Sequence, residues 1–122
     1  MLYLPIVIMQ YGVDEIAMFR YDHVDETVNL IVSAFNPEKI IIFGSVARGT
    51  ATDESDLDIL VVMDSDSKPT RRAREIYSAT SDIDLAMDII VLTSDEFWEN
   101  RDNPCSFLSE IVRTGIVVYG FR

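Results

Sequence analysis

Two pairs of residues in the middle of the chain have the types and the spacing that phosphate chemistry needs. Gly44 and Ser45 follow a short apolar run, and Asp56 and Asp58 come after ten intervening residues. Side chains two residues apart on a strand point to the same side, and two residues advance the chain by about 6.6 Å. Asp56 and Asp58 therefore offer neighbouring carboxylates on one surface, while Leu57 between them faces the core.

Neighbouring carboxylates of this kind can share divalent cations. Mg²⁺ prefers carboxylate and phosphate oxygens. Two such ions, roughly 3.5 to 4 Å apart, stabilise the attacking and leaving oxygens of a phosphoryl-type transfer. We therefore predict that Asp56 and Asp58 bind two Mg²⁺ ions.

The Gly44–Ser45 turn is predicted to bind phosphate. Gly44 lets a phosphate approach the backbone without a side chain in the way, and Ser45 can donate both its N–H and its hydroxyl. A short helix is expected over residues 45–48, and the positive end of its dipole would face the turn. Arg48 can lie on the same side as Ser45 and add a charge-assisted contact. The phosphates of a nucleoside triphosphate would then lie between this helix terminus and the two metal ions.

A third carboxylate should complete the metal site, and it should come from a neighbouring strand. Asp88 lies in the apolar run MDIIVL, where a charge is costly unless a metal or another partner compensates it. Asp84 is the alternative, because residues 81–85 (SDIDL) resemble residues 55–59 (SDLDI). No Gly-Ser pair stands at the required distance before that second stretch, so we favour Asp88.

Apolar periodicity predicts the elements that position these residues. One helical face is formed by Val24, Val28, Ile31, Val32 and Phe35. Asp22 can cap the start of this helix, and Asn36-Pro37 ends it. Short apolar runs predict strands over residues 40–43, 57–63, 87–92 and 116–119.

Three further helices are predicted in the second half of the chain. Pro69 suits the first position of one helix, and the nearby arginines 71, 72 and 74 are interpreted as a solvated basic stripe. Thr93 and Glu96 form a capping box for the next helix, whose Phe97 and Trp98 are interpreted as core residues. Gly115 stops the last helix.

Composition narrows the classes of function. The chain has 122 residues and a formal net charge of -11, which argues against direct binding of nucleic acid through its phosphates. One cysteine and one histidine exclude the usual structural zinc patterns and an internal disulfide, so a cytoplasmic location is the default. We expect a single domain over residues 1–122 without an extra substrate-recognition domain.

Residues 1–21 are treated as an amino-terminal extension with no assigned role. Its first nine residues, MLYLPIVIM, are almost wholly apolar, but the run is shorter than the roughly 18 residues that span a membrane. No Lys or Arg precedes the run as in a signal peptide. We expect a strand or a contact surface for a homo- or hetero-oligomer here, and no membrane partner.

The combined pattern resembles a known superfamily. Gly44-Ser45 followed after ten residues by Asp56-x-Asp58 is similar to the signature of the DNA polymerase β-like nucleotidyltransferases. The longer stretch GSVARGTATDESDLDILVV resembles the minimal, MntA-like nucleotidyltransferases, which are the antitoxins of HEPN/MNT toxin–antitoxin pairs. The later segments MDIIVLTSDEFWEN and SEIVRTGIVVYG extend the resemblance over roughly residues 24 to 120.

The resemblance implies an α/β (α+β) fold with a small mixed sheet and helices packed against it. It also implies ATP as substrate, two Mg²⁺ ions, and transfer of AMP to a tyrosine hydroxyl of a HEPN ribonuclease toxin. Gly44 and Ser45 would then hold phosphate, and Asp56, Asp58 and Asp88 would bind metal, with Asp88 helping to deprotonate the acceptor.

Three other interpretations stay open at this point. The chain could be an antitoxin that inhibits its partner by binding alone, or a nucleotidyltransferase that acts on a small molecule such as an aminoglycoside or on an RNA end. The third is an acidic α/β domain whose aspartates are merely solvated.

Overall fold

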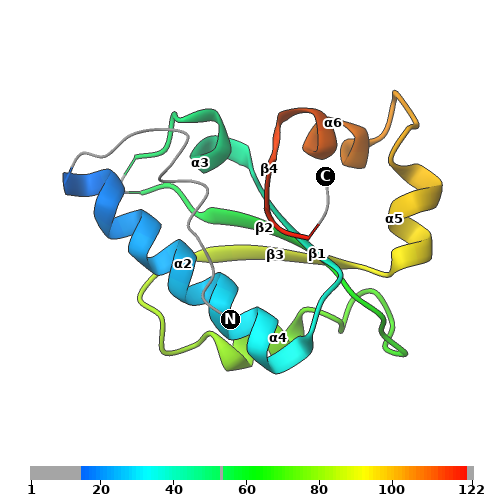
Figure 1. Cartoon of the computed structure of the whole chain (residues 1–122), viewed down its shortest axis with the longest axis horizontal. Helices are drawn as coiled ribbons and strands as arrows, with labels where there is room; N and C mark the ends of the chain where they lie inside the picture. The colour runs from blue at the N-terminus through cyan, green and yellow to red at the C-terminus, as the bar shows by residue number, and fades with distance from the viewer. Residues whose placement is uncertain (1–14, 53, 121–122) are drawn as a thin grey trace.

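The computed structural model describes residues 15–52 and 54–120, which form a four-stranded mixed sheet with helices on both faces (Figure 1). The strands are β1 (Lys39–Phe43), β2 (Leu57–Val62), β3 (Met87–Leu92) and β4 (Ile116–Tyr119). The helices are α2 (Glu15–Phe35), α3 (Gly44–Arg48), α4 (Arg74–Ala79), α5 (Ser94–Asn100) and α6 (Phe107–Thr114). This architecture confirms the expected α/β fold and the mixed sheet.

The strand order β3-β2-β1-β4 sets where the ends of the strands meet. β1 is antiparallel to both β2 and β4, whereas β2 and β3 are parallel. The starts of β2 and β3 and the end of β1 therefore lie side by side, along the edge of the sheet that is formed by strand ends. That edge carries α3 and the aspartates singled out above.

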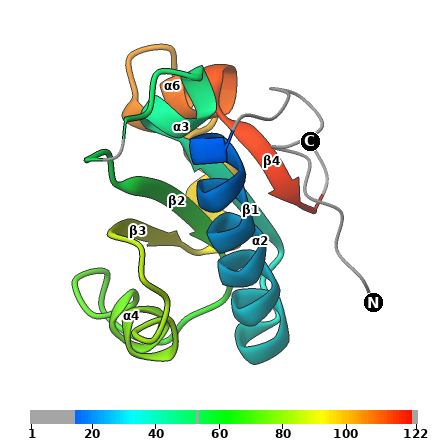
Figure 2. The same ribbon diagram turned by 90° about the vertical axis from the view of Figure 1, so that its left-hand side faces the viewer.

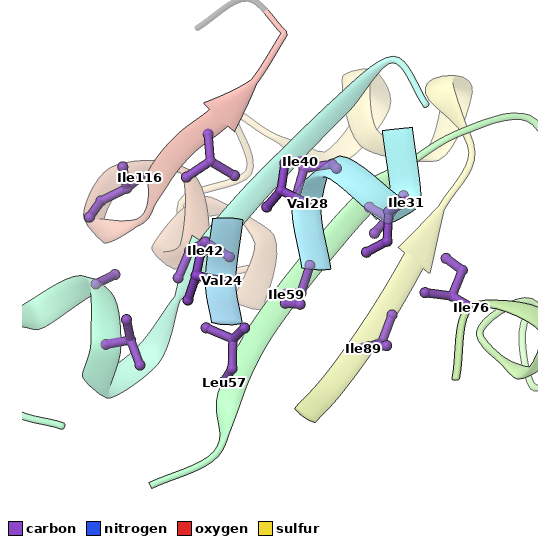
Figure 3. Close-up of a cluster of buried hydrophobic side chains, with 14 of the residues drawn as sticks. Val24, Val28, Ile31, Ile40, Ile42, Leu57, Ile59, Ile76, Ile89 and Ile116 are labelled. Atoms are coloured by element: carbon purple, nitrogen blue, oxygen red, sulfur yellow. The ribbon is translucent and has the colours of Figure 1, made fainter. Parts of the chain in front are cut away.

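One face of the sheet packs against α2, which runs across it (Figure 2). The 3.6-residue period brings the predicted apolar positions of α2 to one side, where they are buried against alternate residues of the strands. Figure 3 shows this cluster, which includes Val24, Val28, Ile31, Ile40, Ile42, Leu57, Ile59, Ile76, Ile89 and Ile116.

The opposite face packs against α5 and α6. Its buried residues are the other alternate positions of β1 and β2 together with apolar residues of the two helices: Ile41, Phe43, Leu60, Val62, Phe97, Leu108 and Ile111. The two central strands are thus buried on both faces, as continuous apolar runs predict. Gly115, at the end of α6, lies so close to Ile41 and to the carbonyl oxygen of Ile111 that a Cβ would not fit.

Several predicted elements are confirmed, including the strands, the end of α2 at Phe35 and the capping box of α5. In the capping box, the N–H of Glu96 donates to Thr93 Oγ1 at 3.3 Å, and the N–H of Thr93 donates to Glu96 Oε1 at 2.8 Å. Phe97 is buried, as predicted.

Four local predictions are wrong. Arg72 is not part of a solvated stripe, because its side chain is largely buried and forms an ion pair with Glu96. α2 begins at Glu15 rather than after Asp22, because the residues before Asp22 also favour a helix and a cap residue does not end one. α4 begins at Arg74, since Pro69 lies in a turn closed by the N–H of Arg71 on the carbonyl of Lys68 at 2.8 Å. Trp98 is 46% exposed and is therefore not a core residue.

The apolar run over residues 1–9 lies outside the described residues. Among the helices of residues 15–52 and 54–120, none has the length and apolar character that crossing a membrane requires.

Packing of α2 on the sheet can be tested by shortening one of its buried side chains. Ile31 is fully buried, so we expect Ile31→Ala to lower the free energy of unfolding by about 2–5 kcal/mol, and Ile31→Val by about 0.5–1.5 kcal/mol. Urea denaturation followed by circular dichroism measures both changes. The exposed Glu99→Ala on α5 is the control, with a change within about 0.5 kcal/mol. An Ile31→Ala value as small as this control would contradict the packing.

Candidate active site

Asp58 and Asp88 lie opposite each other on adjacent parallel strands. Each is the second residue of its strand, and their pairing in register turns both side chains to the same face of the sheet. Asp56 stands one residue before β2 and is exposed, while Leu57 is fully buried, as predicted. The structure thus brings the three predicted aspartates to one edge of the sheet.

Gly44, in the turn predicted to bind phosphate, lies directly against the side chain of Asp58. β1 ends at Phe43, which pairs with Asp58, and α3 begins at the next residue. Gly44 has a φ of +71°, and a Cβ on it would overlap Oδ2 of Asp58. Glycine is required here both for its backbone conformation and for the space that the carboxylate fills. The sequence motif therefore describes a physical contact between its two halves.

α3 presents Ser45 and Arg48 beside this contact. Phe43 is the N-cap residue and provides no side-chain hydrogen bond to the first turn. The carbonyl of Ser45 accepts the N–H of Thr50 at 2.9 Å, which closes the far end of the short helix. Arg48 is exposed in the last turn, and its charge acts on Asp58.

The ionisation of Asp58 is disfavoured by its surroundings. Burial raises the pKa of Asp58 above its usual range, and the charges of Asp88 and Asp56 raise it further. Arg48 opposes this shift of the pKa but does not cancel it. A cation placed between the carboxylates would relieve their repulsion.

The three aspartates fit a magnesium ion that is bound together with a substrate. Within residues 15–52 and 54–120, no three or more His, Cys, Asp or Glu side chains are placed to hold one ion by themselves. Mg²⁺ usually keeps several waters and is held by one or two carboxylates plus substrate phosphates. The mutual repulsion at Asp58 and the oxygen-only donor set match that mode of binding. The roles of the three residues as metal ligands stay a prediction.

Asp84 lies apart from this group. It is exposed in the turn before β3, four residues ahead of Asp88, and it has no strand partner. Asp88 is also exposed, because β3 is an edge strand. The expectation that Asp88 is a charge buried among apolar residues is therefore wrong, although the strand register does pair it with Asp58.

The raised pKa of Asp58 predicts a pH-dependent stability. Because the folded chain holds this proton more tightly than the unfolded chain, stability falls as pH rises from the ordinary carboxyl range through the raised pKa. We expect Asp58→Asn to be more stable than the wild type at neutral pH, and this gain to shrink as the pH falls through the pKa of Asp58. Urea denaturation between pH 4 and pH 8, in buffer stripped of divalent metals, measures the difference.

Asp84→Asn is the matched control for this experiment. It removes a carboxylate from residues 81–85, which resemble residues 55–59 but lie outside the group of three aspartates. It should therefore not reproduce the gain in stability expected for Asp58→Asn. Two results would contradict a raised pKa of Asp58. One is equal stability of the wild type and Asp58→Asn at neutral pH, and the other is a gain in stability of Asp58→Asn that is seen only at acidic pH.

Comparison with known proteins agrees with this geometry. The family model described as "Polymerase beta, Nucleotidyltransferase" matches residues 26–121. A protein of Methanocaldococcus jannaschii named "Putative protein adenylyltransferase" is 51% identical over 45 residues. These residues make up 35% of this chain and 45% of that protein, so the match spans less than half of the relative.

A solved structure extends the likeness over almost the whole chain. The crystal structure of a protein from Sulfolobus solfataricus, titled "putative nucleotidyltransferase", superposes with a TM-score of 0.61 at 26% sequence identity. The superposition covers 89% of this chain and 91% of the other. The matched residues include β1, α3, β2 and β3, which carry the candidate site. The chain therefore belongs to the polymerase β nucleotidyltransferase family, a family of transferases.

Proposed function

We propose that this chain transfers AMP from ATP to a tyrosine hydroxyl of a partner protein, a HEPN ribonuclease toxin, and so acts as its antitoxin. The observation that carries the proposal is the Asp58–Asp88 pair, with Gly44 in contact with Asp58. The name of the Methanocaldococcus jannaschii relative, a protein adenylyltransferase, supports a protein acceptor. The motif GSVARGTATDESDLDILVV, with its resemblance to MntA-like antitoxins, supports the toxin as that acceptor.

Asp56, Asp58 and Asp88 would hold the magnesium ions. When bound, Mg²⁺ supplies positive charge for the triphosphate and for the oxygens whose bonds change. The aspartates themselves position these charges at the edge of the sheet where α3 begins. Their two strands are held in register by a continuous ladder, which keeps the spacing of the carboxylates fixed.

Gly44, Ser45 and Arg48 would hold the triphosphate. The backbone N–H groups in the first turn of α3 receive no side-chain cap from Phe43, so they are available to phosphate oxygens. The hydroxyl of Ser45 and the guanidinium of Arg48 are further donors on the same short helix. ATP would thereby be oriented with its α-phosphate towards the aspartates.

Asp88 is placed to act on the acceptor. The acceptor oxygen forms a bond to the α-phosphorus of ATP while the bond from that phosphorus to the bridging oxygen breaks and pyrophosphate leaves. The proton of the tyrosine hydroxyl passes to a carboxylate, for which Asp88 is the candidate. Asp88 lies exposed on an edge strand, where a side chain from a second protein can reach it.

Transfer of label tests the proposal directly. The purified chain is incubated with Mg²⁺, ATP labelled at the α-phosphate, and a HEPN ribonuclease as the candidate acceptor protein. We expect label on the partner, and a loss of at least about 10- to 100-fold in the transfer rate for Asp56→Asn, Asp58→Asn and Asp88→Asn. Mass spectrometry then identifies the modified side chain.

Asp84→Asn is again the control and should keep the wild-type rate. Inhibition of the partner that survives the three substitutions without transfer of label would establish inhibition by binding alone. Label on a small molecule or RNA instead of the protein would contradict the protein acceptor.

The contact between Gly44 and Asp58 predicts a second effect on transfer. Gly44→Ala introduces a Cβ that must displace the Asp58 carboxylate, so we expect a large loss of transfer rate. Gly49→Ala is the matched control, because Gly49 ends the same helix with a nearly equal φ of +75° and is exposed. Both variants carry the backbone strain, of about 1–2 kcal/mol, that a left-handed conformation imposes on alanine. Equal losses of transfer rate in the two variants would show that strain alone is responsible.

A further inference from the structure

A cavity of about 300 Å³ lies between the sheet and the end of α6, on the face that packs against α5 and α6. Apolar side chains of β1, α6 and β4 line part of it, among them Ile41, Val112 and Val117. Its charged lining residues are Lys39, Arg101 and Arg113. No Asp or Glu lines the cavity in the described part of the chain, although the whole chain has a net charge of -11.

Lys39 is the most unusual of the three cations. As a residue of β1 it is only 3% exposed, and lysine is almost never fully buried without a charged partner. Its Nζ lies 5.2 Å from the centre of the Phe97 ring and 5.3 Å from that of Trp98. Among the described side chains, those of residues 23–52 and 54–120, no carboxylate forms an ion pair with it. The two rings therefore stabilise the ammonium group, while none of its N–H donors bonds to a described residue.

Arg101 is a second cation with a buried N–H group that lacks a hydrogen-bond partner among the described residues. Its Nε is buried and donates no hydrogen bond to any described residue. Its nearest carboxylate is Asp102 at 3.6 Å, whose side chain is 92% exposed and thus strongly hydrated. The guanidinium also lies 5.0 Å from the centre of the Trp98 ring. Lys39 and Arg101 are near enough for their charges to repel.

That repulsion acts together with burial on the pKa of Lys39. Burial lowers its pKa, the charge of Arg101 lowers it further, and Glu38 only partly offsets both. Arg113 is the third cation, and it is held at 2.6 Å by Glu110 on the exposed side of α6. A bound anion would relieve the unfavourable electrostatics and use the free donors of Lys39 and Arg101.

We propose that this cavity is an anion-binding site, separate from the active site, for a small molecule with a compact phosphate or carboxylate group and an apolar portion. The anionic group would lie against Lys39 and Arg101, and the apolar portion against Ile41 and Val117. Lys39 begins β1 and Phe43, the partner of Asp58, ends it, so the two sites are about 13 Å apart along the strand.

The single tryptophan of the chain reports on this site. Trp98 contacts both Lys39 and Arg101, so an anion that draws these cations away from its ring should change its fluorescence. The chain is titrated with inorganic pyrophosphate or with citrate, in buffer stripped of divalent metals. Sodium chloride of matched ionic strength is the reference. We expect a saturable change, and a stronger response to pyrophosphate or to citrate identifies phosphate or carboxylate as the preferred group.

Three variants test the assigned residues. Lys39→Met keeps the apolar stem and Arg101→Met keeps packing on Trp98, and each should weaken binding at least about tenfold by removing a charge-assisted contact. Arg113 also lines the cavity and its side chain is 69% exposed, so Arg113→Gln should weaken binding of the anion with little effect on folding. Equilibrium dialysis with radiolabelled pyrophosphate and with radiolabelled citrate measures binding independently of fluorescence.

The controls separate this site from the catalytic aspartates. Arg71→Gln removes an exposed positive charge outside the cavity and should bind as the wild type does. Asp56→Asn and Asp58→Asn should also retain binding, so loss of transfer activity and loss of this site can be told apart. The proposal fails if neither probe binds in dialysis beyond the salt reference, or if Lys39→Met and Arg101→Met bind as tightly as the wild type.

Discussion

The parallel pairing of β2 with β3 is the constraint on which the candidate active site depends. It places Asp58 directly opposite Asp88, although thirty positions separate them in the numbering. Like charges so close are unfavourable, and they raise the pKa of Asp58. The apolar residues that follow in both strands are buried between helices and hold this register. Packing energy from the rest of the sheet thus offsets the electrostatic cost at its edge.

The same constraint explains the glycine of the motif. β1 runs antiparallel to β2, so the residue after β1 must pass beside the start of β2, where Asp58 stands. A Cβ at position 44 would overlap the Asp58 carboxylate, so that carboxylate would have to move. Gly44 is therefore needed first for the position of Asp58, and in the proposed function its lack of a side chain would also let a phosphate approach the backbone. Glycine at this position leaves the space that the Asp58 carboxylate fills, and in the proposed function it would also allow a phosphate to come close to the backbone.

The extent to which the sequence predicts the structure differs between local and long-range features. The buried strands and the capping box depend on neighbouring residues, so their pattern was sufficient to predict them. The choice between Asp84 and Asp88 depends on strand register, which packing sets. Asp88 is exposed rather than buried, and its strand β3 lies at the edge of the sheet. Trp98 follows Phe97 on a short helix, where adjacent residues point about 100° apart, so only one of them could face the core.

Lys39 shows most clearly why burial cannot always be predicted from neighbouring residues in the sequence. It follows Asn36, Pro37 and Glu38, residues that are typical of an exposed loop. Yet it shares the alternate side of β1 with Ile41 and Phe43, and that side is covered by α5. A charge in this position is tolerated because two aromatic rings, supplied by a distant segment, replace part of its hydration. This face of the sheet consequently has carboxylates at one end and a buried lysine beside two arginines at the other, so the charges at its two ends are opposite.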